Sequence, residues 1–165
     1  MKNPRKRARN YLGVDEKIRS PTRYERLLRA SNLELRIRPA EETLADIIAA
    51  GKKTRHINID MPNPIKMKST IETVIRAAPQ ILFPNSKIFI ASEDESVIAH
   101  AVAAAKRYGL RTQKMAELQR IQTPRGLIYP RRATAFMREY MRITGNPIYR
   151  IAIIFTPKTA RRNQK

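Results

Sequence analysis

Residues 86–114 constrain the fold more than any other part of the chain, because they predict a complete strand–helix–strand unit. Residues 87–91 form a short run rich in Ile and Phe, with the length and composition of a buried strand. Ser92 and Glu95 have the spacing of a capping box, in which each side chain satisfies a free backbone N–H at a helix start. Gly109 suits the position just past the end of that helix, and we expect the next strand to start at Leu110. The apolar stripe of the helix, at helical spacing, comprises Ile98, Ala101, Val102, Ala105 and Tyr108.

Two earlier segments, 33–38 and 55–60, alternate between apolar and polar residues, which predicts strands with one polar face. A sheet covered on both sides would be apolar on both faces. Strands joined by a single helix run parallel through right-handed crossovers. We therefore predict an α/β fold: a two-layer α/β sandwich with a mixed, mostly parallel sheet, helices mainly on one face and a late β-hairpin around 124–126. The other expected elements are helices at 23–30, 40–50, 64–79 and 134–143, and strands at 118–122, 126–129 and 148–155.

The distribution of charge suggests how the 165 residues are organised. Residues 1–10 carry five basic and no acidic side chains, and 118–165 carry 11 basic residues against one acid, Glu139. Residues 11–117 are closer to balance, with 18 basic and 13 acidic side chains. We expect a basic N-terminal arm and connector at 1–21, a single α/β domain at 22–155 and a basic C-terminal tail at 156–165.

Composition limits the classes of protein to which the chain can belong. It has no cysteine, which excludes disulfides, thiolate metal sites and cysteine nucleophiles. No apolar run approaches the ~18 residues that a membrane-spanning helix needs, and no apolar segment of a secretory signal follows the basic N-terminus. We expect a protein that is not secreted, does not bind membranes, and is cytoplasmic or associated with the nucleoid or another nucleoprotein.

The net charge of +20 is the main functional signal. So large an excess repels itself unless a polyanion is the usual partner, which makes nucleic acid, DNA or RNA, the expected partner. Assembly with other proteins stays open. The candidate nucleic-acid-binding residues lie in both arms, on one strand and in the C-terminal third: Arg5, Lys6, Arg7, Arg9, Arg36, Arg38, Arg120, Arg125, Arg131, Arg132, Arg138, Arg142, Arg161 and Arg162.

An open sheet face is one candidate interface for a phosphate backbone. Arg36 and Arg38 would share that face with His56 and Asn58 if their strands are neighbours. Aromatic side chains nearby could stack on bases, although each could equally belong to the core. These aromatic candidates are Phe89, Tyr129 and Tyr149.

Acidic residues offer a second kind of chemistry. Asp60 ends one strand and the acids at 93–95 follow another, beyond the strand ends where ligands of parallel sheets usually bind. Two such sets could hold Mg²⁺ for a nuclease. Acids in the first turn of a helix also balance its dipole, and neither set has a lysine two residues after an acid, as the familiar nuclease pattern requires.

We predict no catalytic residue, no bound metal and no cofactor. His56 and His100 are the only histidines, which is too few for a zinc site without cysteine. The patterns G-x-x-x-x-G-K-[ST], G-x-G-x-x-G and G-x-S-x-G do not occur. The favoured hypothesis is a non-enzymatic nucleic-acid-binding protein that engages phosphates through its arms and its C-terminal arginines. A structural component of a ribonucleoprotein or packaged genome and a Mg²⁺-dependent nuclease are the alternatives.

Overall fold

The computed structural model describes residues 11–15, 33–37, 39–60, 64–131, 133 and 135–156, with the backbone alone at 11–15, 33–37, 60, 64, 135 and 136. The chain divides into two compact units, residues 1–50 and 51–165. The domain boundaries after residues 21 and 155 stay predictions. The helix expected at 23–30 and almost all of the two basic segments lie outside the described residues.

The first unit combines a small parallel sheet with one helix. β1 (Tyr11–Asp15) pairs with β2 (Leu33–Ile37) in parallel without a register shift. α2 (Ala40–Ala49) follows β2 and packs on β1. The strand at 33–37 and the helix after it were predicted, whereas residues 11–15, predicted as part of a connector, form a strand.

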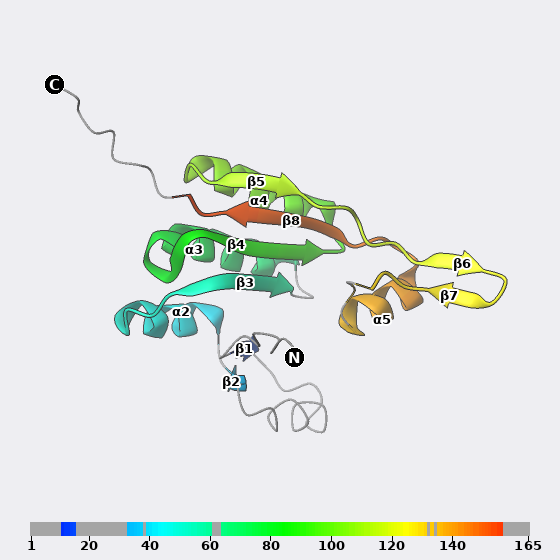
Figure 1. Cartoon of the computed structure of the whole chain (residues 1–165), viewed down its shortest axis with the longest axis horizontal. Coiled ribbons are helices and arrows are strands. Elements are labelled where there is room, and N and C mark those ends of the chain that lie inside the picture. Colours follow the sequence, from blue (N-terminus) through cyan, green and yellow to red (C-terminus); the bar gives the residue numbers. More distant parts are fainter. Residues whose placement is uncertain are drawn as a thin grey trace, which may run out of the picture. The chain divides into compact units, whose positions relative to one another are not determined.

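The second unit contains a four-stranded sheet in the order β3-β4-β8-β5 (Figure 1). β3 (Thr54–Asp60) and β4 (Leu82–Ser92) are parallel. β8 (Tyr149–Ile154) is antiparallel both to β4 and to β5 (Arg111–Lys114), so β5 runs in the direction of β4.

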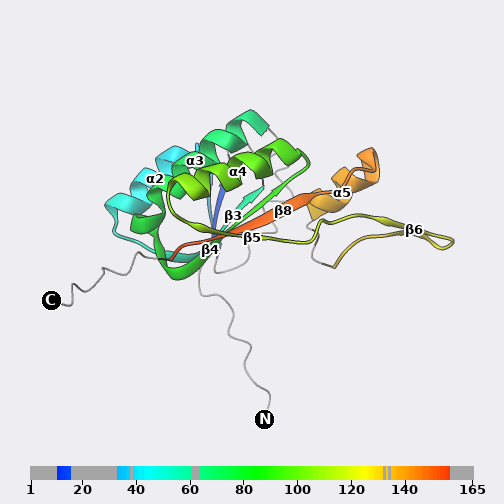
Figure 2. The same cartoon turned by 90° about the horizontal axis from the view of Figure 1, so that it is seen from above.

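Helices α3 (Pro64–Ile81) and α4 (Glu95–Arg107) lie on the same side of this sheet (Figure 2). α3 connects β3 to β4, and α4 connects β4 to β5. These two layers confirm the predicted fold class, a two-layer α/β sandwich with a mixed sheet. None of the described helices is both long and apolar enough to span a bilayer.

The core lies between the two layers. Ile88 and Ile90 on β4 and Ile153 on β8 are at most 1% exposed and fill its centre. Ile71, Val74, Ile75 and Ala78 of α3 recur at helical spacing and are at most 3% exposed.

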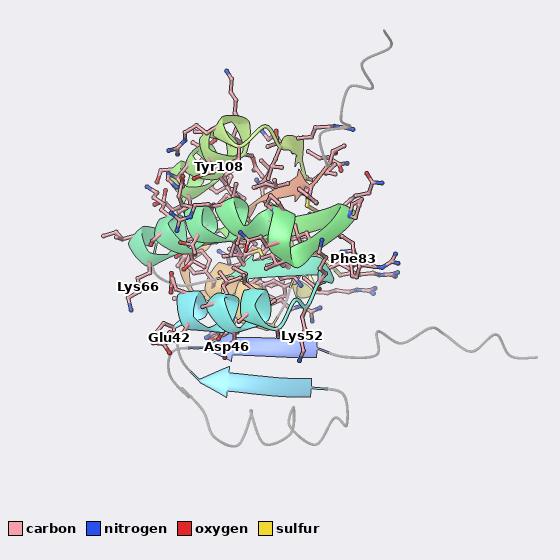
Figure 3. The ribbon with its side chains drawn as sticks, turned by 90° about the vertical axis from the view of Figure 1, so that its left-hand side faces the viewer. Glu42, Asp46, Lys52, Lys66, Phe83 and Tyr108 are labelled. Carbon is pink, nitrogen blue, oxygen red and sulfur yellow. The ribbon has the colours of Figure 1, made fainter. Side chains whose placement is uncertain are left out.

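The predicted stripe of α4 is partly wrong. Val102 and Tyr108 are 39% and 40% exposed, and Tyr108 reaches the surface seen in Figure 3. An alanine-rich helix carries two overlapping patterns at helical spacing, and the sheet selects the one with smaller residues, which allows a closer approach. The side chains that α4 buries are Val97, Ala101, Ala104 and Ala105.

The end of α3 also differs from the prediction. Pro79, expected to limit the helix, lies within its last turn, and α3 continues to Ile81. A proline in mid-helix removes a hydrogen bond and clashes with the preceding turn, but near the end little of the helix remains to be disrupted.

A separate module follows β5. β6 (Ile121–Thr123) and β7 (Gly126–Ile128) form the predicted late hairpin, and α5 (Ala135–Thr144) comes after it. Both views show the hairpin and α5 beyond the carboxyl end of β4 (Figures 1 and 2). This placement positions the module beside the edge at which parallel sheets bind ligands.

Candidate functional site at the carboxyl edge of the sheet

The carboxyl ends of β3 and β4 lie side by side. In the parallel register Asp60, the last residue of β3, is opposite Ala91, and β4 ends one residue later at Ser92. Ligands of open α/β sheets bind beyond such strand ends. We therefore take this edge as the candidate functional site.

The start of α4 at this edge is capped by Asp94, which corrects the predicted Ser92 cap. The Asp94 carboxylate accepts a hydrogen bond of 2.8 Å from Ser96 N, and Ser92 Oγ accepts one of 3.1 Å from Asp94 N. β4 extends one residue beyond its predicted end and includes Ser92, so the cap moves two residues along. The hydrogen bonds from Ser96, assisted by the charge of Lys68, hold the pKa of Asp94 below its usual value of 3.8.

A lysine joins the first turns of the two core helices. Lys68 Nζ on α3 donates a hydrogen bond of 3.0 Å to Ser96 Oγ on α4. This cation therefore lies close to the capping carboxylate, and the corner carries both signs of charge.

α5 forms a wall next to the same edge. Met137 and Met141 of α5 pack in a buried cluster with Ala91 at the end of β4, while Tyr129 and Tyr140 pack against it. The cluster is completed by Leu118, Ala133 and Ile148. Met137 and Met141 therefore form the buried side of α5.

A hollow of about 370 Å³ lies against α5 and is lined by Tyr129, Ala133, Arg138, Glu139 and Arg142. The Arg142 guanidinium donates two hydrogen bonds, of 2.9 and 2.6 Å, to the Glu139 carboxylate. These bonds lower the pKa of Glu139 and raise that of Arg142. The Tyr129 hydroxyl is buried and has no hydrogen-bond partner within the described part of the chain.

The face of the sheet opposite α3 and α4 is polar along β3. His56 and Asn58 are exposed and pair in register with Lys87 and Phe89, so all four share this face. The rings of His56 and Phe89 are 6.1 Å apart. Tyr149, by contrast, lines a hollow together with α4 residues and is on the helix side.

The condition set for Arg36, that its strand is a neighbour of β3, is not met. Arg36 lies on β2, whose hydrogen-bonded neighbour is β1 and not β3. Both strands alternate in polarity, but alternation alone does not identify a strand's neighbour.

The described C-terminal arginines differ in their exposure and in their hydrogen-bond partners. Arg125 and Arg131 are exposed on the hairpin and just after it. Arg138 and Arg142 share α5 as predicted, but Arg138 Nε donates to Ala133 O at 3.1 Å and Arg142 is paired with Glu139. Arg120 is half-buried beside Gly145. The other candidates, Arg5, Lys6, Arg7, Arg9, Arg38, Arg132, Arg161 and Arg162, lie outside the described residues.

The acids do not assemble into a metal site in the part of the chain that the structure describes, where no three His, Asp or Glu side chains come together. Asp94 serves as a helix cap, a role that the sequence pattern assigned to Ser92. Sequence reasoning missed Lys68 and the role of Tyr129 as a polar wall residue. The aspartate–glutamate–serine order at 94–96 was the signal that could have located the true cap.

No family model and no curated protein matches this sequence, but solved structures match its fold. A precorrin 8W decarboxylase from Methanobacterium thermoautotrophicum has a TM-score of 0.60 at 14% identity, over 90% of this chain and 70% of that chain. A precorrin-6y C5,15-methyltransferase from Geobacter metallireducens has a TM-score of 0.57 at 14% identity, over 88% of this chain and 68% of that chain. A structure named as a methyltransferase and complexed with SAH has a TM-score of 0.58 at 13% identity, over 90% of this chain and 40% of that chain.

These matches contradict the prediction of a non-enzymatic nucleic-acid-binding protein. Two of the three structures are named as methyltransferases, so the description of the chain as a DNA-binding, RNA-binding or ribonucleoprotein component whose role is binding alone is corrected with that prediction. The error has a physical origin, because net charge reports on what a surface attracts and contains no information about the fold beneath it. At these identities the similarity establishes the fold: this chain has the α/β fold of methyltransferase structures.

Proposed function

We propose that this chain is a methyltransferase that takes its methyl group from S-adenosylmethionine (SAM). The observation that carries the proposal is the match of about nine-tenths of the chain to methyltransferase folds, with TM-scores of 0.57 and 0.58. The candidate site at the carboxyl edge of β3 and β4 supports it, because this is where such a sheet would bind a cofactor.

The donor groups at this edge fit the chemistry of SAM in part. SAM carries a sulfonium, an ammonium group and a ribose diol, all of which suit carboxylates. Asp60 and Glu93 stand at the ends of β3 and β4. Lys68 is the cation at this corner that would pair with the cofactor's own carboxylate. The five glycines of the chain all lie elsewhere, so a glycine-rich turn at these strand ends is not the binding device.

The cofactor, when bound, supplies a methyl group on a positively charged sulfur. The residues of this chain would bind it, keep its charges paired and present the acceptor molecule. Tyr129, Arg138 and Arg142 are suited to the last task, because they line the hollow next to α5.

The test is to measure binding of SAM and SAH by calorimetry, using the full chain and two variants. Asp60→Asn removes a charge at the end of β3 and should weaken SAM binding about tenfold or more, the loss expected for one hydrogen bond to a charged group. Glu42→Gln removes the same charge from an exposed position on α2, in the unit that does not contain β3 and β4, and should leave binding unchanged. Failure of the unaltered chain to bind either compound at about millimolar concentration would overturn the proposal.

A further inference from the structure

We infer that the β6–β7 hairpin, together with α5, receives a nucleic acid as the substrate of this protein. The inference rests on the proposed function, since it names the class of molecule that would carry the methyl acceptor. The module consists of the described residues between β5 and β8, which are 115–148 apart from 132 and 134.

The hairpin is a defined structure, and its tip is basic. Thr123 Oγ1 donates a hydrogen bond of 2.8 Å to Gly126 O and accepts one of 3.3 Å from Arg125 N. These bonds close the turn and fix the backbone of Arg125, whose side chain is exposed. The hairpin extends away from the sheet in both views (Figures 1 and 2), so its tip is presented to a large partner.

One face of the hairpin is apolar and exposed. Ile121 and Ile128 are opposite each other in the register of the two strands and are 61% and 55% exposed. Ile143 on α5 is 68% exposed. A projecting cross-strand pair of this kind resembles the apolar wedges with which proteins contact bases, and a two-stranded ribbon also fits a nucleic-acid groove.

The charge of the module favours a polyanion. Residues 115–148 contain six arginines and two acids, Glu117 and Glu139. Glu139 is already paired with Arg142, and Arg138 of the module and Arg150 of β8 donate to the backbone carbonyls of Ala133 and Ala116. These three arginines stiffen the module, while the exposed Arg125 and Arg131 are placed to contact phosphates.

The module is also joined to the candidate site. α5 packs on Ala91 at the carboxyl end of β4, and Tyr129 directly follows β7 and lines the hollow. A nucleic acid that lies along the hairpin would therefore bring a base or sugar to the edge where the methyl donor is proposed to bind. The positive charge alone would equally suit an anionic membrane. The exposed pair of isoleucines, however, lies on a narrow two-stranded ribbon next to a hollow that is lined by arginines. This combination favours a ligand that carries both phosphates and flat apolar bases.

The test compares Arg125→Gln/Arg131→Gln with the control Arg76→Gln/Lys106→Gln, which removes two positive charges from exposed positions on α3 and α4. Affinities are measured across a salt series for a labelled RNA stem-loop, a single-stranded RNA and a duplex DNA of equal length. The hairpin variant should bind at least tenfold more weakly, with the slope of log affinity against log salt reduced by about 1.4 to 1.8, corresponding to two phosphates. The control should change both quantities much less.

A second variant tests the apolar face. Ile121→Thr/Ile128→Thr keeps the β-branched shape and the charge, so it should lower the affinity while leaving the salt slope unchanged. Equal affinity of the hairpin and control variants for all three nucleic acids would overturn the inference. Hairpin-dependent binding to anionic phosphatidylserine vesicles, with no binding to nucleic acid, would also overturn it. SAM binding measured on the same samples separates this failure from failure of the proposed function, because both hairpin variants should bind SAM like the unaltered chain.

Discussion

Gly145 and Arg120 approach each other so closely that a Cβ on Gly145 would lie 3.0 Å from Arg120 Nη2. Gly145 has φ +77° and ends α5 by donating a hydrogen bond of 3.0 Å to Met141 O. The position therefore needs glycine for its left-handed backbone and for the space that the guanidinium occupies.

Replacement of Gly145 by alanine should destabilise the protein by more than the backbone strain alone, which is about 1 kcal/mol. The matched control is Gly51→Ala, because Gly51 has φ +60° and nothing within 4 Å of its would-be Cβ. Thermal melting should show a larger drop in Tm for Gly145→Ala, and the difference between the two variants measures the Arg120 contact. Equal drops in Tm would mean that Arg120 moves aside without cost.

The Asp94 cap should make stability depend on acid pH. Its pKa is lowered in the folded state from the usual 3.8, so the unfolded chain takes up the proton first as the pH falls. The stabilisation is fully present above the unfolded pKa and is lost as the pH drops through the folded value. Asp94→Asn keeps a capping oxygen but does not titrate. The Tm of the unaltered protein minus that of this variant should therefore shrink below about pH 4, and a difference that is constant from pH 7 to pH 2 would contradict the role of the charge.

The alanine face of α4 should not tolerate larger side chains. Ala101 is fully buried, and Ala101→Leu should cost about 1–3 kcal/mol of unfolding free energy through overpacking. Ala103, two residues along, is exposed, and Ala103→Leu should be nearly neutral because leucine is also a good helix former. Urea denaturation of both variants gives the two values, and a neutral Ala101→Leu would mean that α4 can move away from the sheet.

The sequence predicted the layers of this fold better than the details of its site. Local patterns were sufficient for the strands and helices described between residues 33 and 114 and for the hairpin, because each depends on spacing or turn chemistry within a few residues, but they missed β1. Spacing within a segment does not encode contacts between distant segments. Such contacts decide which strand pairs with β2, that β8 pairs with β4, and which side chains of α4 face the sheet. The same applies to the site: Arg138 and Arg142 lie within the helix predicted at 134–143, but their partners Ala133 and Glu139 are seen only in the structure.

The arrangement of β8 has a consequence for how the protein is made. β8 separates β4 from β5, so β5 gains its only neighbour within the described sheet when the chain has been synthesised to residue 149 and beyond. During synthesis on the ribosome, one edge of β4 and the whole of β5 therefore remain without their partner strand until the hairpin module and β8 have been synthesised. Pairings between distant segments form slowly, and open strand edges are prone to aggregation. A nascent chain of this protein is therefore expected to need protection during that interval, because β8, the last of the described strands, is the one that completes the sheet.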